Sequence, residues 1–205
     1  HNYEFKNDNV GLVCKVGGAN NSILDKLNCE NTLKNILNDF PSRKCKVYLL
    51  HGDLNEDEMH NLYIHPKIKA IINFGHGEGF GLPLFEAAYC GLPVITHDFG
   101  GQKDFLTMEK DGKKKSMFSK VQYDLSKIQQ EALWTCCTHA DMNWAYVKPV
   151  SAKNCMREVY KDWGRFKGQA KKLQEYILEE YTTEKKYSEF ISHFDIFTDI
   201  ASIIG

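Results

Sequence analysis

Several absences narrow what this sequence of 205 residues can encode. No run approaches the roughly 20 consecutive apolar residues of a membrane helix, so we expect no integral membrane segment. The formal net charge is −1, which gives no electrostatic reason to expect nucleic acid as a partner. No signal peptide is visible, and the chain lacks a starting Met. His1 is therefore either a cloning remnant or an internal position of a longer chain.

The cysteine pattern lacks any Cys-x-x-Cys pair, which argues against a zinc site. Seven cysteines are present, an odd number at scattered positions. This pattern favours a reduced, cytoplasmic protein. Hydrophobic residues make up 42% of the chain and charged residues 26%, as in an ordinary soluble globular protein whose length allows one large domain.

Short apolar runs alternate with helical patterns in the first half of the chain. The expected strands are Val10–Val16, Lys46–Leu50, Ile68–Phe74 and Pro93–Thr96, and the expected helices are Asn28–Phe40, Asn55–Tyr63 and Pro83–Cys90. Asn55 is a candidate N-cap of the second helix. Because the strands are continuous apolar runs, we expect a parallel sheet covered on both faces. The prediction is an α/β fold, a Rossmann-like doubly wound parallel sheet whose core is residues 1–106.

The second half of the chain is less regular. Lys110–Lys120 is highly charged and is expected to be a solvated loop, with a binding patch as the alternative. Val121–Trp144 is expected to be irregular. Helices are expected at Ser151–Tyr160, Lys167–Glu180 and Tyr187–Ile204. We therefore expect a single domain over residues 1–205, in which residues 107–205 form a loop and extra C-terminal helices.

The segment Phe74–Gly91, "FGHGEGFGLPLFEAAYCG", carries the chemistry. Its first four glycines, Gly75 to Gly81, follow an expected strand, at the sheet edge where ligands bind, and they let the backbone approach a ligand closely. The next helix begins there, and a helix amino end favours phosphate. Glu78 and Glu86 can border the same pocket and accept hydrogen bonds from sugar hydroxyls. The pattern fits a sugar nucleotide, and a glycine-rich turn with incidental surface glutamates is the alternative.

The string "GEGFGLPLFEAAYCGLPVI" resembles the donor-site motif of retaining glycosyltransferases of the GT-B fold, of the glycosyltransferase family 4 type. The resemblance continues through "THDFGGQKDFL" and, more weakly, through "VQYDLSKIQ" and "WAYVKPVSAKNCMREVY". "HPKIKAIINFGHGEGFG" is similar to a subgroup common in phage and marine microbial sequences. The resemblance implies that this chain is the C-terminal, donor-binding half of a two-domain enzyme, without the N-terminal acceptor domain.

The resemblance also implies roles for individual residues. Glu78 would lie beside the donor sugar as the catalytic-site carboxylate, and Glu86 would bind ribose hydroxyls. The backbone of Gly79, Phe80, Gly81 and Leu82 would contact sugar and phosphate. The strand and loop "VYLLHGDL" would pack against the nucleotide base, which makes Gly52 and Leu54 candidate base contacts, with an ordinary turn as the alternative.

Other candidates are weaker. The family's phosphate-binding Arg/Lys pair would lie upstream of His1, so Lys15 is either a substitute or a solvated lysine at a strand end. His76 is either an edge of the sugar pocket or a polar loop residue. For His51 and His97 we expect structural roles. No His/Asp/Glu group has metal spacing and the family generally binds its donor without metal, so we expect no metal and no cofactor.

The implied reaction transfers a sugar, with retention, from a UDP- or GDP-linked donor to a hydroxyl acceptor. The chain alone is expected to be inactive because the acceptor domain is missing. Three alternatives remain: a non-catalytic nucleotide-sugar-binding module, a nucleotide-sugar epimerase of related fold, and a structural protein with an empty pocket.

Overall fold

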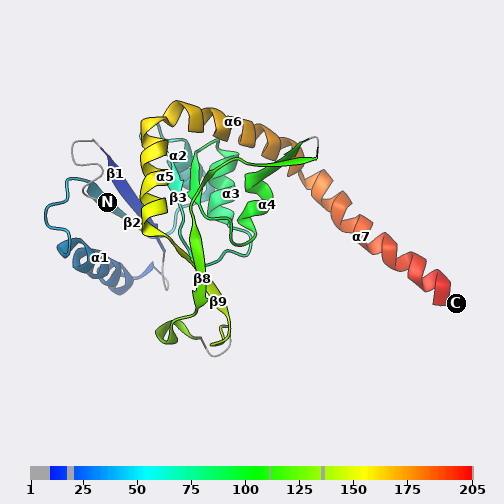
Figure 1. The fold of residues 1–205 in the computed structure, drawn as a ribbon, viewed down its shortest axis with the longest axis horizontal. Helices are drawn as coiled ribbons and strands as arrows, with labels where there is room; N and C mark the ends of the chain where they lie inside the picture. Colours follow the sequence, from blue (N-terminus) through cyan, green and yellow to red (C-terminus); the bar gives the residue numbers. More distant parts are fainter. Residues whose placement is uncertain (1–9, 18–20, 111, 135–136, 205) are drawn as a thin grey trace. The chain divides into compact units, whose positions relative to one another are not determined.

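A parallel strand pair and the helix that joins its strands form the first of two units (Figure 1). The structure is a computed structural model that describes residues 10–17, 21–110, 112–134 and 137–204. The chain divides into the units His1–Asn61 and Leu62–Gly205. In the first unit, β1 (Gly11–Val16) pairs in parallel with β2 (Lys46–His51), and α1 (Ile23–Asn38) lies between them in the sequence.

Side-chain caps begin the two early helices. The Ser22 hydroxyl accepts a hydrogen bond from the Asp25 amide at 3.1 Å and caps α1. Asn55 and Glu58 form a capping box at the start of α2 (Glu56–Ile64), because each side chain accepts from the other residue's amide at 2.9 Å. The prediction that Asn55 is an N-cap is confirmed.

The second unit contains a three-stranded parallel sheet in the order β3–β4–β7. Its strands are β3 (Ile71–Ile72), β4 (Val94–Thr96) and β7 (Ser119–Lys120). The helices of this unit are α3 (Leu82–Tyr89), α4 (Gln102–Leu106), α5 (Pro149–Lys161), α6 (Trp163–Glu180) and α7 (Thr183–Ile204). The three predicted C-terminal helices are therefore confirmed as α5, α6 and α7.

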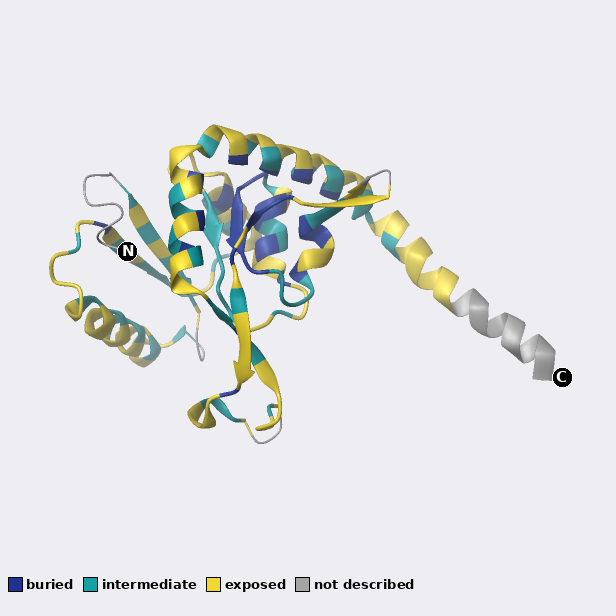
Figure 2. Ribbon diagram, in the orientation of Figure 1, coloured by how far each residue is buried: buried dark blue, intermediate teal, exposed yellow. Residues whose placement is uncertain are grey.

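Helices cover both faces of the β3–β4–β7 sheet. Val94 of β4 packs in a cluster with buried residues of α3, α4 and α6, among them Leu84 and Ile177. The next residue, Ile95, points to the opposite face and packs with residues of α5, among them Val159. Figure 2 shows the buried residues gathered on β4 and on the inner sides of these helices. The prediction of a parallel sheet covered on both faces is confirmed for these three strands.

Two predictions for the middle of the chain are wrong. Within Lys110–Lys120 the structure has part of an antiparallel hairpin, formed by β5 (Thr107–Lys110) and β6 (Lys113–Ser116), and then β7 of the central sheet. The lysines of β6 are exposed, whereas Met117 and Phe118 are buried in the core. A solvated loop would not bury them.

Val121–Trp144 is also more regular than predicted. It contains β8 (Tyr123–Lys127), the short 3-10 helix η2 (Gln130–Ala132) and the start of β9 (Asn143–Val147). β8 and β9 pair antiparallel and run out from the central sheet of this unit as a ribbon (Figure 1).

The observed class is mixed α/β with parallel strands. Among the described strands, none joins β1–β2 to β3–β4–β7, so the single doubly wound sheet that the sequence predicted is not present as such. No helix in the described ranges is both long enough and apolar enough to cross a membrane.

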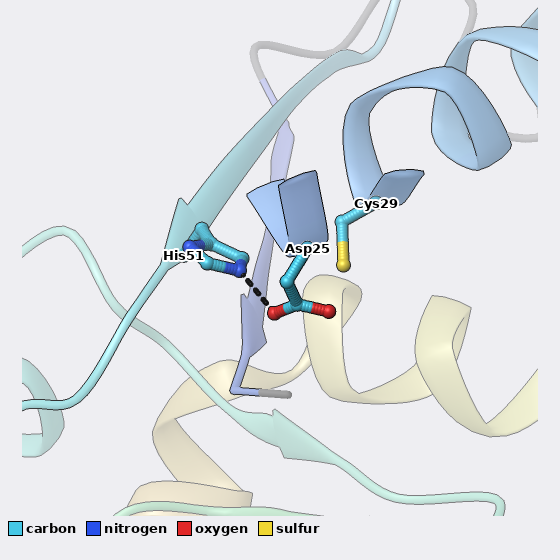
Figure 3. Close-up of side chains that lie close together, drawn as sticks. All are labelled: Asp25, Cys29 and His51. Carbon is cyan, nitrogen blue, oxygen red and sulfur yellow. Dashed lines mark hydrogen bonds and ion pairs between the residues drawn. The ribbon is translucent and has the colours of Figure 1, made fainter. Parts of the chain in front are cut away.

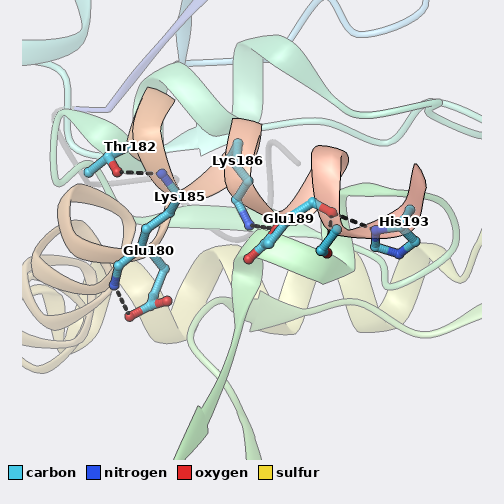
Figure 4. A network of polar contacts seen from close by, with 7 residues as sticks. Glu180, Thr182, Lys185, Lys186, Glu189 and His193 are labelled. Atoms are coloured by element: carbon cyan, nitrogen blue, oxygen red, sulfur yellow. Dashed lines mark hydrogen bonds and ion pairs between the residues drawn. The ribbon is translucent and has the colours of Figure 1, made fainter. Parts of the chain in front are cut away.

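A polar network marks the junction of α6 and α7 (Figure 4). The Thr182 hydroxyl accepts from the Lys185 amide at 3.2 Å, and the Lys185 ammonium pairs with Glu180 at 2.9 Å. One turn later, Lys186 pairs with Glu189 at 2.9 Å. The pair of Lys185 with Glu180 connects the last turn of α6 to the first turn of α7, and the other contacts stabilise the start of α7.

Candidate functional site

The glycine loop begins where the chain leaves β3, and Asn73 fixes its first turn. The Asn73 backbone is held to β4, since its amide donates to the Ile95 carbonyl at 3.2 Å and its carbonyl accepts from the Thr96 hydroxyl at 2.8 Å. Its side-chain oxygen accepts from the Gly75 amide at 2.7 Å, and its side-chain nitrogen donates to Glu78 Oε1 at 2.8 Å. One asparagine thus shapes the loop and orients the Glu78 carboxylate.

The glycine loop packs backbone to backbone against the loop after β4. The Gly101 amide donates to the Glu78 carbonyl at 3.0 Å. A Cβ on Gly101 would lie 1.9 Å from the Gly79 carbonyl oxygen, so a side chain there would force the two loops apart. A Cβ on Gly79, by contrast, would meet nothing within 4 Å. Position 79 therefore has room for a side chain, whereas position 101 has none because it packs on the glycine loop.

Helix α3 starts directly from this loop. Its N-cap, Gly81, has φ 86° and ψ 48°, a left-handed conformation that favours glycine. Within the part of the chain that the structure describes, the amides of residues 79–82 donate to no protein acceptor. Together with the positive end of the α3 dipole, these N–H groups suit an anion such as a phosphate.

Glu86 lies on α3, half-buried, one turn into the helix. Its Oε2 accepts a hydrogen bond from the Tyr63 hydroxyl at 3.1 Å. Tyr63 is itself buried, and this burial together with the neighbouring Glu86 carboxylate raises the pKa of the Tyr63 hydroxyl well above its usual value. Tyr63 therefore stays a hydrogen-bond donor, which holds the Glu86 carboxylate in place.

His76 is not a merely polar loop residue. Its Nδ1 donates to the Ala145 carbonyl at 2.9 Å, and its ring stacks on Trp144 with centroids 4.7 Å apart and planes 4° apart. The Tyr146 ring lies 4.6 Å away, centroid to centroid. His76 thus joins the glycine loop to β9.

His97 has the structural role that the sequence predicted. Its Nε2 donates to the Gly75 carbonyl at 2.5 Å, and its Nδ1 accepts from the Phe99 amide at 3.1 Å. This pair of bonds defines a neutral ring protonated on Nε2. Gln102, fully buried beside it, donates to the Phe99 carbonyl at 2.8 Å.

The two apolar candidates differ in their contacts. Phe80 is 45% exposed, and its ring packs on Phe85 and Phe105 with centroid distances of 5.2 and 5.1 Å. Leu82 is 57% exposed at the start of α3. Both present apolar surface beside the loop amides.

Lys15, Gly52 and Leu54 lie in the first unit. The Lys15 ammonium donates to the Gly52 carbonyl at 2.6 Å, and the Lys15 residue is half-buried. The lysine at this strand end is therefore only partly solvated, because its ammonium is bound to the turn after β2. Gly52 has φ 107° and open space around it, so this turn requires glycine. The roles of Gly52, Leu54 and Lys15 toward a donor stay predictions.

Sequence reasoning missed the residues that support the site, chiefly Asn73, Gln102 and Trp144. Asn73 has a recognisable signal, since a polar residue near the end of an apolar strand often caps the following turn. Gln102 and Trp144 have none, because their roles depend on contacts across the fold.

Comparisons with known proteins find sequence similarity, and one of them places it over the segment that contains this site. Residues 45–116 match the sequence profile of the family "Glycosyl transferases group 1". Over 95 residues the chain is 35% identical to the serotype-specific mannosyltransferase WbdA of Escherichia coli. This alignment covers 46% of this chain and 10% of that protein. The chain thus spans about a tenth of the length of the curated relative that it matches. The matched range contains the glycine loop with Glu78 and Glu86.

Proposed function

We propose that this chain is the donor-binding part of a retaining glycosyltransferase. Its strands would belong to a Rossmann-like sheet that is complete only in the whole protein. The observation that carries the proposal is the glycine loop between β3 and α3. It presents unpaired amides, an oriented Glu78 and a half-buried Glu86 together, inside the segment that matches the group 1 profile. A nucleotide sugar needs this combination of amide donors for phosphate and carboxylates for hydroxyls.

In this proposal each group has a separate task. The amides of residues 79–82 and the start of α3 bind the pyrophosphate and stabilise the negative charge that builds on the leaving phosphate. Glu86 binds the ribose hydroxyls. Glu78, held by Asn73, lies at the donor sugar, where positive charge develops on an oxocarbenium-like centre. Its carboxylate is oriented before the donor arrives.

The donor is proposed to be UDP- or GDP-linked. The similarity to a mannosyltransferase favours mannose as the first sugar to test. Calorimetric titration of the chain with UDP, GDP and their hexose conjugates, GDP-mannose among them, tests the binding step. We expect one nucleotide sugar to bind and Glu86→Gln to weaken it. If no nucleotide or nucleotide sugar binds, the proposal is wrong.

A transfer assay with labelled donor and a panel of glycan, lipid and protein acceptors tests the catalytic step. Transfer with retained anomeric configuration supports the enzyme. Donor binding without transfer by the whole protein supports the non-catalytic module instead, and conversion of donor without acceptor supports the epimerase.

A further inference from the structure

Three side chains with metal-binding atoms converge in the first unit (Figure 3). Asp25 and Cys29 come from α1, and His51 is the last residue of β2. His51 Nε2 lies 2.6 Å from Asp25 Oδ2, and one ligand atom from each of the three residues lies within 4.8 Å of the others. The group combines nitrogen, sulfur and oxygen donors.

The cluster occupies the face of α1 that packs against β2. Asp25, Cys29, Leu33 and Leu37 recur every four residues, and all four are half-buried, so they form one stripe along the helix. The stripe is apolar at its C-terminal end and ligand-bearing at its N-terminal end. The His51 side chain is 7% exposed and that of Asp25 is 20% exposed. Ionisable groups on a packing face are costly unless they bind a partner.

Little else holds α1 in place. None of its residues is fully buried, and Ile23, Leu24 and Ile36 are each more than half exposed. Apolar burial therefore contributes little to its attachment, in contrast to α3 and α6, which have several fully buried side chains. Bonds between side chains of α1 and β2 would provide the attachment of α1 that apolar packing does not.

We propose that Asp25, Cys29 and His51 bind a divalent transition-metal ion of the Zn²⁺ class and that this ion clamps α1 to β2. His, Cys and carboxylate side chains are all Zn²⁺ ligands, and a tetrahedral ion held by these three would keep a fourth position for water, as in open zinc sites. On binding, the Cys29 thiol releases its proton, and the proton of His51 Nε2 moves to Nδ1 or to solvent. The ligand atoms then adjust to about 3.3–3.7 Å from one another, as tetrahedral bonds of about 2.0–2.3 Å require.

This inference does not depend on the proposed donor site, because none of its three residues has a role there. It revises the expectation of no metal. That expectation depended on two absences in the sequence, namely Cys-x-x-Cys pairs and metal spacing among His, Asp and Glu. The structural role expected for His51 is kept, with the metal ion as its partner. The cluster was missed because it has a single cysteine and because His51, on another element, lies 22 residues beyond Cys29 in the sequence.

Cobalt provides the direct test, because Co²⁺ can replace Zn²⁺ and a thiolate bound to it gives a charge-transfer absorption in the near ultraviolet. We expect the 205-residue chain to bind one Co²⁺ with this absorption and to release it to Zn²⁺. Cys29→Ser should abolish the absorption. Asp25→Asn and His51→Ala should weaken Zn²⁺ binding by more than the roughly tenfold that loss of a group hydrogen-bonded to a metal ligand costs.

Two matched variants serve as controls. Cys14→Ser removes another half-buried thiol of the first unit, whose pKa is raised by burial so that it resists forming a thiolate. Glu30→Gln removes a carboxylate of α1 that pairs with Lys26 at 4.0 Å. Both should bind Co²⁺ and Zn²⁺ like the parent chain.

Thermal unfolding of the parent chain with and without Zn²⁺ gives a second measurement, which does not depend on how well a variant folds. The parent chain should gain stability on adding Zn²⁺, and Cys29→Ser, checked for fold by circular dichroism, should not. Absence of the thiolate absorption in the parent chain at one equivalent overturns the proposal. Survival of that absorption in Cys29→Ser does the same and means an adventitious ion only.

Discussion

At the scale of single residues, Asn73 shapes the candidate site through two side-chain hydrogen bonds. It bonds the Gly75 amide and the Glu78 carboxylate through opposite ends of one amide group. We expect Asn73→Asp to lower nucleotide-sugar affinity by roughly tenfold, because a carboxylate can accept from Gly75 but repels Glu78. Calorimetric titration measures this, with Asn35→Asp on the exposed side of α1 as the control. Equal affinities for Asn73→Asp and the parent chain would show that Glu78 needs no support from Asn73.

Glu86 can be tested without disturbing its neighbour. Glu86→Gln retains an oxygen that accepts from the Tyr63 hydroxyl, so the free energy of unfolding should change by less than about 1 kcal/mol. Nucleotide affinity should nevertheless fall by roughly tenfold, since a charged acceptor for the ribose hydroxyls is lost. The matched control is Glu175→Gln, an exposed position on α6. Unchanged nucleotide affinity in Glu86→Gln removes Glu86 from the site.

At the scale of elements, the glycine loop after β3 and the loop after β4 pack tightly against each other at Gly79 and Gly101. Gly101→Ala should destabilise the protein by about 2 kcal/mol or more, because its Cβ would collide with the Gly79 carbonyl. Its φ of −70° is ordinary for alanine, so the effect is one of contact and not of backbone preference. Gly79→Ala should leave stability nearly unchanged and should weaken donor binding alone. Denaturant unfolding and nucleotide titration of both variants separate the two effects, and equal stability of the two variants would contradict the close contact of Gly101 with the Gly79 carbonyl.

The sequence predicted elements well where apolar runs or caps define them. The first two strands, α1, α2, α3 and the C-terminal helices follow from such runs, from Asn55 and from the Pro83 to Gly91 interval. β8 and β9 were missed because cross-strand hydrogen bonds define their ribbon, and β8 buries no residue. The Lys-rich β6 was missed for the same reason. In the candidate site, the motif predicted Glu78 and Glu86, whereas Asn73 and Trp144 depend on contacts that only the folded chain reveals.

At the scale of the whole molecule, stability should fall in strong alkali partly through Tyr181. Burial, followed by the nearby Tyr176, raises the pKa of the Tyr181 hydroxyl from 10.0 to about 12. The unfolded chain therefore ionises first, so the stability that depends on a protonated Tyr181 is complete below pH 10.0 and is lost as the pH rises toward about 12. Tyr181→Phe should flatten the dependence of melting temperature on pH in this range, whereas Tyr187→Phe, at a 65% exposed residue, should not. Parallel curves for the parent chain and Tyr181→Phe would show that Tyr181 ionises alike in both states.

Strand β4 is the middle strand of its sheet, and its consecutive residues Val94 and Ile95 pack into different clusters on opposite faces. The two helical layers of the second unit therefore share one short segment of backbone. Because both layers pack directly on β4, we expect α3, α4 and α6 to come apart in the same cooperative event as α5. The bonds that β4 makes with its neighbours, such as the one from the Val121 amide to the Thr96 carbonyl, should open only in that event. In hydrogen–deuterium exchange these amides should form the slowest group of the unit, and a loss of packing on one face should speed exchange on both.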